Sequence, residues 1–196
     1  MSAQMNDQSR APYSNTWLKS YYYLRFAVSA AWVAVAFTVA KNNPPLAAVM
    51  LIAYPAWDAL ANYVDAQRTG GLSRNKSQLL NFAVSVIATI AVAIALGRGM
   101  NAVLAVYGVW AVVSGAFQLL TAVRRWKTNG AQWAMILSGA QSALAGLFFV
   151  KMAGGTEAIG IVDVAPYAAF GAFYFLVSAV WLSISDVLRK SPQAAN

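Results

Sequence analysis

The tetrapeptide Phe-Ala-Val-Ser at residues 26–29 occurs again at residues 82–85, an offset of 56 residues (82 minus 26). Other positions related by this offset carry polar or small side chains: Asp58 and Ser114, Asn62 and Gln118, Ala83 and Gly139. Each repeating unit contains two apolar segments, and self-similarity at a fixed period is typical of a repeat architecture. The sequence therefore predicts three tandem helical hairpins.

The composition indicates that these hairpins lie in a membrane. Of the 196 residues, 60% are hydrophobic and only 10% are charged, whereas a soluble domain usually has about 25% charged residues. A single soluble core of this size could not bury six segments of about 20 apolar residues each. We therefore expect an all-α, polytopic membrane protein with six transmembrane helices.

Turn and cap residues set the expected limits of these helices. Pro44 suits a first helical turn, where its missing N–H is not needed, and glycines separate the later segments. The expected helices are residues 19–40, 44–67, 77–97, 101–124, 130–151 and 163–188, which form hairpins at about 19–67, 77–124 and 130–188. Residues 17–190 then form the membrane domain, between a mobile tail at 1–16 and a C-terminal tail at 191–196.

The basic residues predict the orientation of the chain. The net charge is +8, from 14 Lys and Arg against 6 Asp and Glu. All of the basic residues except Lys41, Arg98 and Lys151 fall on one side of the expected membrane domain. The cytoplasmic side usually carries this excess, so we expect both termini in the cytoplasm of a bacterial cell, with the chain in the inner (plasma) membrane. The basic residues lie between apolar segments, so we expect no nucleic acid partner.

Several kinds of chemistry are excluded or unexpected. The chain has no Cys and no His, which removes disulfides, thiolate chemistry, imidazole acid–base chemistry and the usual zinc and haem ligands. No phosphate-binding loop or zinc-protease motif is present, and no nucleophile stands beside a base. We therefore expect no enzymatic activity, no catalytic residues, no metal site and no cofactor.

Asp58 is the most informative polar residue, because it falls well inside the second apolar segment. An ionisable residue at that depth is costly unless it is paired or hydrated. If the first hairpin turns near residues 42–43, Arg25 lies within reach of Asp58 on the neighbouring helix. The favoured interpretation is a structural pair between Arg25 and Asp58. The alternatives are an Asp58 that takes up a proton or contacts a ligand, and one that is hydrated by a locally thinned membrane.

Pro55 lies three residues before Asp58 and is expected to kink the same helix. A proline inside a helix removes one backbone hydrogen bond, so the Leu51 carbonyl must find another donor. Such a kink beside an acidic residue can line a cavity, although it can equally be tolerated without one.

The other polar residues of the membrane segments are expected to join helices. Asn62 and Gln118 follow Asp58 and Ser114 by four residues and so lie on the same helix faces. They could form a polar axis between hairpins, but hydrogen bonds between helices, worth about 0.6 kcal/mol each, are the favoured interpretation. Gln141 is interpreted in the same way. Small residues such as Gly139 and Gly146 are expected at helix contacts.

The stretch Tyr107–Gly115, continued by Ala122–Arg125, resembles the HdeD-like acid-resistance membrane proteins, a family built from a short membrane repeat of unknown function. The similar features are a Trp, a small residue before Gly, and a basic helix end, followed by a Gly-containing segment at residues 130–155. The resemblance covers about residues 20–188. It implies a bacterial inner-membrane protein of six helices linked to acid stress, and it assigns no catalytic or transport residues. Asp58 departs from the pattern, because Ala59 rather than Gly follows it.

Three functions are compatible with these features. The first is a non-enzymatic inner-membrane protein with a stress-related or membrane-integrity role. The second is a small-solute or proton-coupled permease that uses Asp58. The third is an accessory subunit of a larger membrane complex. The expected partners are membrane lipids, with a homo-oligomer or a larger complex as further options.

Overall fold

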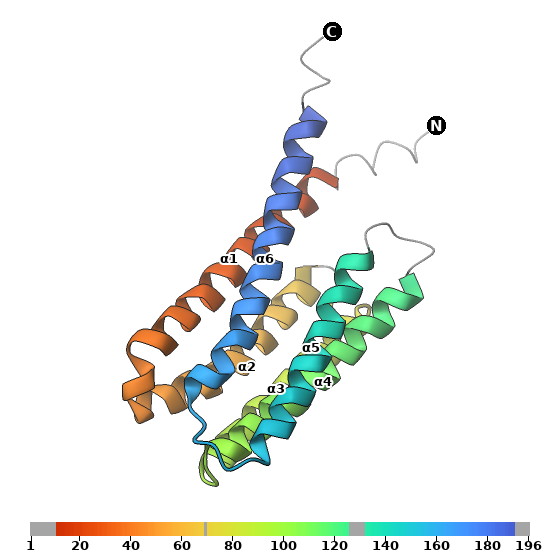
Figure 1. Cartoon of the computed structure of the whole chain (residues 1–196). Coiled ribbons are helices and arrows are strands. Elements are labelled where there is room, and N and C mark those ends of the chain that lie inside the picture. The colour runs from red at the N-terminus through yellow and green to blue at the C-terminus, as the bar shows by residue number, and fades with distance from the viewer. Residues whose placement is uncertain (1–10, 69, 126–131, 191–196) are drawn as a thin grey trace, which may run out of the picture. The chain divides into compact units, whose positions relative to one another are not determined.

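The computed structural model describes residues 11–68, 70–125 and 132–190, and these residues contain helices and no β-strand (Figure 1). The elements are α1 (Ala11–Thr38), the short 3-10 helix η1 (Ala40–Asn42), α2 (Pro44–Arg68), α3 (Lys76–Leu96), α4 (Met100–Arg125), α5 (Gln132–Ala153) and α6 (Ile161–Lys190). The described part of the chain therefore has the all-α class that the sequence predicts.

The limits of α2, α3 and α4 each agree with the prediction to within one residue. At the start of α2, Asn43 Oδ1 accepts the Leu46 N–H at 3.2 Å and so caps the helix. Helix α1 differs most, because it begins at Ala11 instead of residue 19. Pro12 suits a first helical turn. Residues 11–16 of the expected tail are therefore helical, and residues 1–10 and 191–196 lie outside the described residues.

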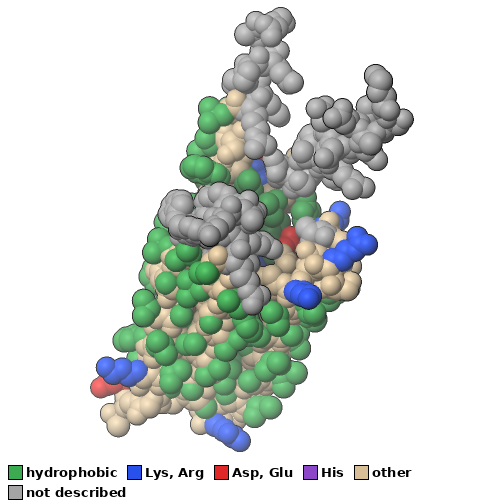
Figure 2. Space-filling model, turned by 90° about the vertical axis from the view of Figure 1, so that its right-hand side faces the viewer, with side chains coloured by type: hydrophobic (Ala, Val, Ile, Leu, Met, Phe, Trp, Pro, Cys, Tyr) green, Lys and Arg blue, Asp and Glu red, His purple; other side chains and the backbone are tan. Residues whose placement is uncertain are grey.

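Five of the described helices, α2 to α6, are long and apolar enough to cross a membrane. The shortest, α3, has 21 residues, or about 31 Å at 1.5 Å per residue, which matches a hydrocarbon layer about 30 Å thick. Helix α1, which contains Arg25 and three consecutive tyrosines, is not among these five helices. Figure 2 shows hydrophobic side chains over much of the face in view, with Lys and Arg in a few separate groups. These features indicate a multi-pass membrane protein.

The chain divides into two compact parts. The larger part, residues 35–167, contains α2 to α5 and the start of α6, and in it α2 packs against α3, α3 against α4, and α4 against α5. The described residues of the smaller part are 11–34 and 168–190. In the smaller part α1 and α6 are antiparallel, joined by an ion pair between Lys19 and Asp186 (3.1 Å) and by a hydrogen bond between the Tyr23 and Ser183 hydroxyls (3.2 Å).

Glycines bring α4 and α5 into the closest helix contact described. A Cβ added to Gly115 would lie 2.5 Å from the Gly139 carbonyl oxygen, and one added to Gly108 would lie 2.8 Å from that of Gly146. The converse holds at both positions, since a Cβ on Gly139 or Gly146 would meet the backbone of the opposite helix. Between the two glycine pairs, the Ser142 hydroxyl donates to the Ala111 carbonyl at 3.0 Å. The packing role predicted for Gly139 and Gly146 is therefore confirmed.

Candidate functional site

A hydrogen-bonded network centred on Asp58 joins three helices of the larger part. The Ser85 hydroxyl on α3 donates to Asp58 Oδ2 at 2.7 Å. The Asn62 amide, one turn along α2, donates to the same oxygen at 3.0 Å and to the Asp58 carbonyl at 2.8 Å. Trp110 Nε1 on α4 donates to Ser85 Oγ at 3.2 Å. The chain of donors from Trp110 through Ser85 to Asp58 therefore links α4, α3 and α2.

Trp110 is also the centre of an aromatic cluster. Its ring makes edge contacts with Tyr54, Tyr107 and Tyr167, at centroid separations of 6.2, 5.6 and 5.9 Å. Such geometry places the positive edge of one ring on the negative face of another. Only 6% of the Trp110 surface is exposed, so the indole N–H needs a protein partner, which Ser85 supplies.

Pro55, which is predicted to kink α2, is part of the same region. Tyr107, which is completely buried, donates its hydroxyl to the Leu51 carbonyl at 2.7 Å. That carbonyl is the one deprived of its helical partner by Pro55, four residues later. The predicted need for another donor is therefore confirmed, and α4 supplies the donor. Because a tyrosine side chain occupies this position, the carbonyl is satisfied within the protein.

A second bond between helices connects this cluster to α5. The Tyr167 hydroxyl, at the start of α6, lies 3.1 Å from the Ser142 hydroxyl. Ser142 in turn donates to the Ala111 carbonyl on α4, and the Tyr167 ring packs against Phe149 on α5. The polar and aromatic contacts thus run from α2 to the start of α6, entirely within the larger part.

Arg25, the expected partner of Asp58, belongs to the smaller part of the chain. There its guanidinium donates to the Tyr21 hydroxyl at 3.1 Å, and its Cζ lies 4.1 Å from the centre of the Phe175 ring. A guanidinium over an aromatic face is attracted by the ring quadrupole. Because Asp58 belongs to the larger part, the pairing of Arg25 with Asp58 stays a prediction.

The other polar residues singled out in the sequence have separate positions. Asn62 joins Asp58, as described above. Ser114 and Gln118 are half-buried on α4, and the structure does not bring them into hydrogen-bond contact with Asp58. Gln141 is half-buried on α5, next to Ser142. The polar axis considered for Asn62 and Gln118 is therefore not formed by a direct bond between the two residues.

The chemistry open to the Asp58 network is limited by its burial. The Ser85 hydroxyl is bonded to the carboxylate, and 0% of the Ser85 surface is exposed. A serine nucleophile needs a base and access to a substrate, and this hydroxyl has no access. Among the described residues, no group of three or more acidic side chains could hold a metal ion. The network is therefore suited to joining helices.

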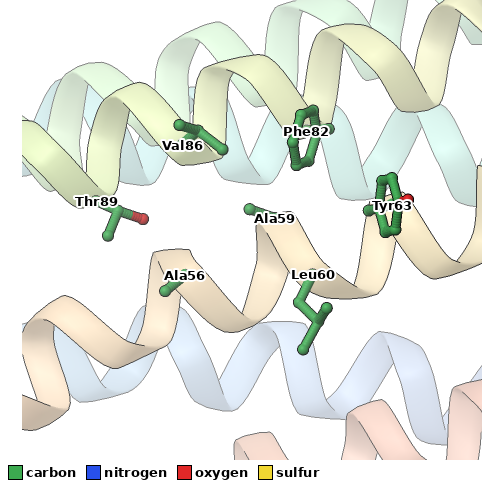
Figure 3. A pocket seen from close by; sticks show the side chains of 7 residues that line it. All are labelled: Ala56, Ala59, Leu60, Tyr63, Phe82, Val86 and Thr89. Carbon is green, nitrogen blue, oxygen red and sulfur yellow. The ribbon is translucent and has the colours of Figure 1, made fainter. Parts of the chain in front are cut away.

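A groove of about 410 Å³ lies between α2 and α3 near this network (Figure 3). Its lining is almost entirely apolar and consists of Ala56, Ala59, Leu60, Tyr63, Phe82, Val86 and Thr89. The Tyr63 and Phe82 rings lie at one end, 5.9 Å apart, and Ala56 and Thr89 lie at the other (Figure 3). Thr89 adds little polarity, because its hydroxyl donates to the Ser85 carbonyl at 2.7 Å.

The residues that complete the network were not all foreseen from the sequence. Ser85 is the last residue of the repeated tetrapeptide, and its equivalent Ser29 is also buried, with 1% of its surface exposed. The repeat therefore contained a signal that this serine position is buried. Tyr107 and Trp110 lie in the stretch that carries the family resemblance, but nothing in that stretch identifies their hydrogen-bond acceptors. A hydroxyl or indole N–H looks like ordinary packing until the three-dimensional position of its acceptor is known.

Residues 83–151 match the sequence model of a family described as a short repeat of unknown function (DUF308). The matched segment runs from α3 to the end of α5 and contains Ser85, Trp110 and the four contact glycines of α4 and α5. No curated protein and no solved structure matches the chain. The segment from α3 to α5 is therefore similar to a short-repeat family, in agreement with the internal repeat of the sequence.

Proposed function

We propose that this chain is a non-enzymatic, six-span protein of the bacterial inner membrane with a stress-related, acid-resistance-like or membrane-integrity role. The observation that carries this proposal is the use of the intramembrane polar groups in helix contacts. Asp58, Ser85 and Trp110 bind one another across three helices, and Tyr107 satisfies the carbonyl freed by Pro55. Such contacts stabilise the arrangement of the helices, and these polar groups are used in hydrogen bonds within the protein.

The six-span topology is part of the proposal, with three tandem hairpins and both termini in the cytoplasm. Helix α1 has 28 residues, long enough to cross a bilayer, and its interaction with α6 pairs it with a candidate span. Fusions of alkaline phosphatase at the expected outer turns, after residues 42, 98 and 155, should be active. Fusions after residue 72 and at the C-terminus should be inactive, and the reverse result would contradict the proposed orientation.

The functional test is acid survival of a bacterial strain from which the gene has been deleted. The wild-type chain and Asp58→Asn should both restore survival, because an amide oxygen can still accept the Ser85 hydroxyl. Gly115→Val should fail to restore it, since this variant breaks the α4–α5 contact. Equal survival of the strain with and without the wild-type gene would contradict the stress role.

A permease is the second candidate, because a carboxylate inside α2 beside a proline is an arrangement that transporters use. In that case Asp58→Asn should abolish proton or solute flux in proteoliposomes while the protein remains folded. Wild-type flux no greater than that of protein-free liposomes would rule out this alternative.

A further inference from the structure

We propose that the α2–α3 groove holds one acyl chain of an anionic phospholipid, whose phosphate binds the basic connection between the same two helices. The proposal goes beyond the stress role, because it assigns a ligand class to a site. The two halves of the proposed site, the apolar groove and the basic connection, are formed by one continuous stretch of the larger part.

The groove has the properties expected of an acyl-chain site. It opens on the outside of two candidate membrane spans, and Leu60 and Tyr63 in its lining are 51% and 40% exposed. Its floor is formed by small or short side chains, including Ala56 and Ala59 (Figure 3). A hydrocarbon chain can occupy such a channel without the loss of any hydrogen bond, whereas a polar solute could not.

The headgroup end is defined by three exposed basic residues, Arg68, Arg74 and Lys76. Arg68 is the last residue of α2 and Lys76 the first of α3. The Arg74 side chain lies beside the turn, since its Cδ would be 3.5 Å from a Cβ added to Gly70. Basic clusters at the ends of transmembrane helices bind anionic headgroups, which favours an anionic over a zwitterionic lipid.

The dimensions of a lipid fit this arrangement. From the level of Tyr63 and Phe82 to that of Ala56 and Thr89, each helix advances seven residues, or about 10 Å. Arg68 and Lys76 lie five and six residues beyond the rings, or about 8–9 Å farther along. The total of about 18 Å is close to one leaflet of the hydrocarbon layer, about 15 Å, plus the phosphate region. A phosphate at the basic connection therefore places the acyl chain in the groove.

The test uses the full chain in mild non-ionic detergent, with native mass spectrometry to count the lipids that stay bound. The probes are phosphatidylglycerol and phosphatidylcholine with identical acyl chains, added at equal concentration. We expect the wild-type protein to retain phosphatidylglycerol about fivefold or more over phosphatidylcholine, from the attraction of its basic residues. Equal retention of the two lipids would overturn the assignment of the headgroup.

Two sets of variants separate the groove from the basic connection. Ala56→Phe fills the deep end of the groove, and its matched control is Ala53→Phe, because Ala53 is exposed on the same helix outside the lining. Only Ala56→Phe should reduce lipid retention. Equal retention by Ala56→Phe and its control would show that the acyl chain lies elsewhere.

The second set replaces the three basic residues together with Gln, a surface change that leaves the helix packing intact. Its control replaces Arg98 and Lys151, which are exposed at the opposite helix ends, with Gln. The triple variant should lose the preference for phosphatidylglycerol, and the control should keep it. If both variants bind like the wild-type protein, the phosphate is not held at the α2–α3 connection and the proposal fails.

Discussion

The α4–α5 and α2–α3 contacts are both antiparallel, and both repeat every seven residues, but different kinds of residue form them. In α4–α5 the contact points are glycine pairs, Gly108 with Gly146 and Gly115 with Gly139. In α2–α3 they are hydrogen bonds from Ser85 to Asp58 (2.7 Å) and from Gln78 to Asp65 (3.1 Å). Seven residues are about two helical turns, so each pair of contacts lies on one face.

The difference in contact residues determines the space between the helices. Glycines let two backbones touch, and α4–α5 is the most extensively packed helix pair described. Between α2 and α3 a carboxylate and a hydroxyl meet instead, and a groove of about 410 Å³ lies between these helices. In a membrane, where no hydrophobic effect pulls helices together, close packing and polar bridging are two separate ways to form a helix pair.

The largest effect is expected from breaking the glycine contact. Gly115→Val would drive a side chain into the Gly139 carbonyl and the Ala143 N–H, which lie 2.5 and 2.7 Å from the new Cβ. Backbone cannot move aside easily, so we expect a loss of about 3 kcal/mol of stability, the upper end for overpacking. The midpoint of SDS-driven unfolding in mixed micelles, followed by circular dichroism, measures this loss.

Ala116→Val is the matched control for this variant, because Ala116 is exposed on the same turn of α4. It places the same valine side chain at an exposed position of the helix. An equal loss of stability in the two variants would mean that valine itself, and not the glycine contact, is responsible.

A smaller effect is expected from breaking the polar contact. Ser85→Ala removes one donor to the half-buried Asp58, which keeps the Asn62 amide, and it leaves the buried Trp110 Nε1 without this acceptor. We expect a loss of about 1–2 kcal/mol, since interhelical hydrogen bonds in membranes are modest but orphaned polar groups are costly. Thr89→Val is the control, because its hydroxyl bonds only within α3, and a similar loss there would argue against the cross-helix network.

The smallest effect concerns the bond that Pro55 makes necessary. Tyr107→Phe removes the donor to the Leu51 carbonyl and should cost about 1 kcal/mol. In a Pro55→Ala background, the restored N–H of residue 55 can bond the same carbonyl, so Tyr107→Phe should cost less. A double-mutant cycle of unfolding free energies tests this coupling, and strict additivity would contradict the explanation.

The sequence predicts the helices of this protein better than their contacts, for a physical reason. Local signals such as Pro44 and the repeat place α2, α3 and α4 to within one residue. Pro55 also predicts an unsatisfied Leu51 carbonyl, because in a helix each carbonyl accepts the N–H four residues later and proline has none. The identity of the donor, Tyr107, depends on how α4 packs, which no local pattern contains.

The same limit applies to Asp58. Its depth in the membrane required a partner, and helix geometry placed Arg25 at a compatible level. The pairing of Arg25 with Asp58 stays a prediction, and position along the membrane normal alone does not identify the other donors to this carboxylate. The donors that the structure shows, Ser85 and Asn62, come from the next helix along the chain and from the same helix.

The hydrogen bond between Tyr107 and Leu51 joins residues that are 56 positions apart, and Tyr54 and Trp110, whose rings also touch, have the same separation. Each of these residues therefore meets its own counterpart in the duplicated unit. If two identical hairpins on separate chains were related by twofold symmetry, both residues of such a contact would have to be of the same type. Tandem fusion removes that restriction. One copy can contain a proline that leaves a backbone carbonyl without its helical donor, and the other copy can supply the hydroxyl that donates to this carbonyl.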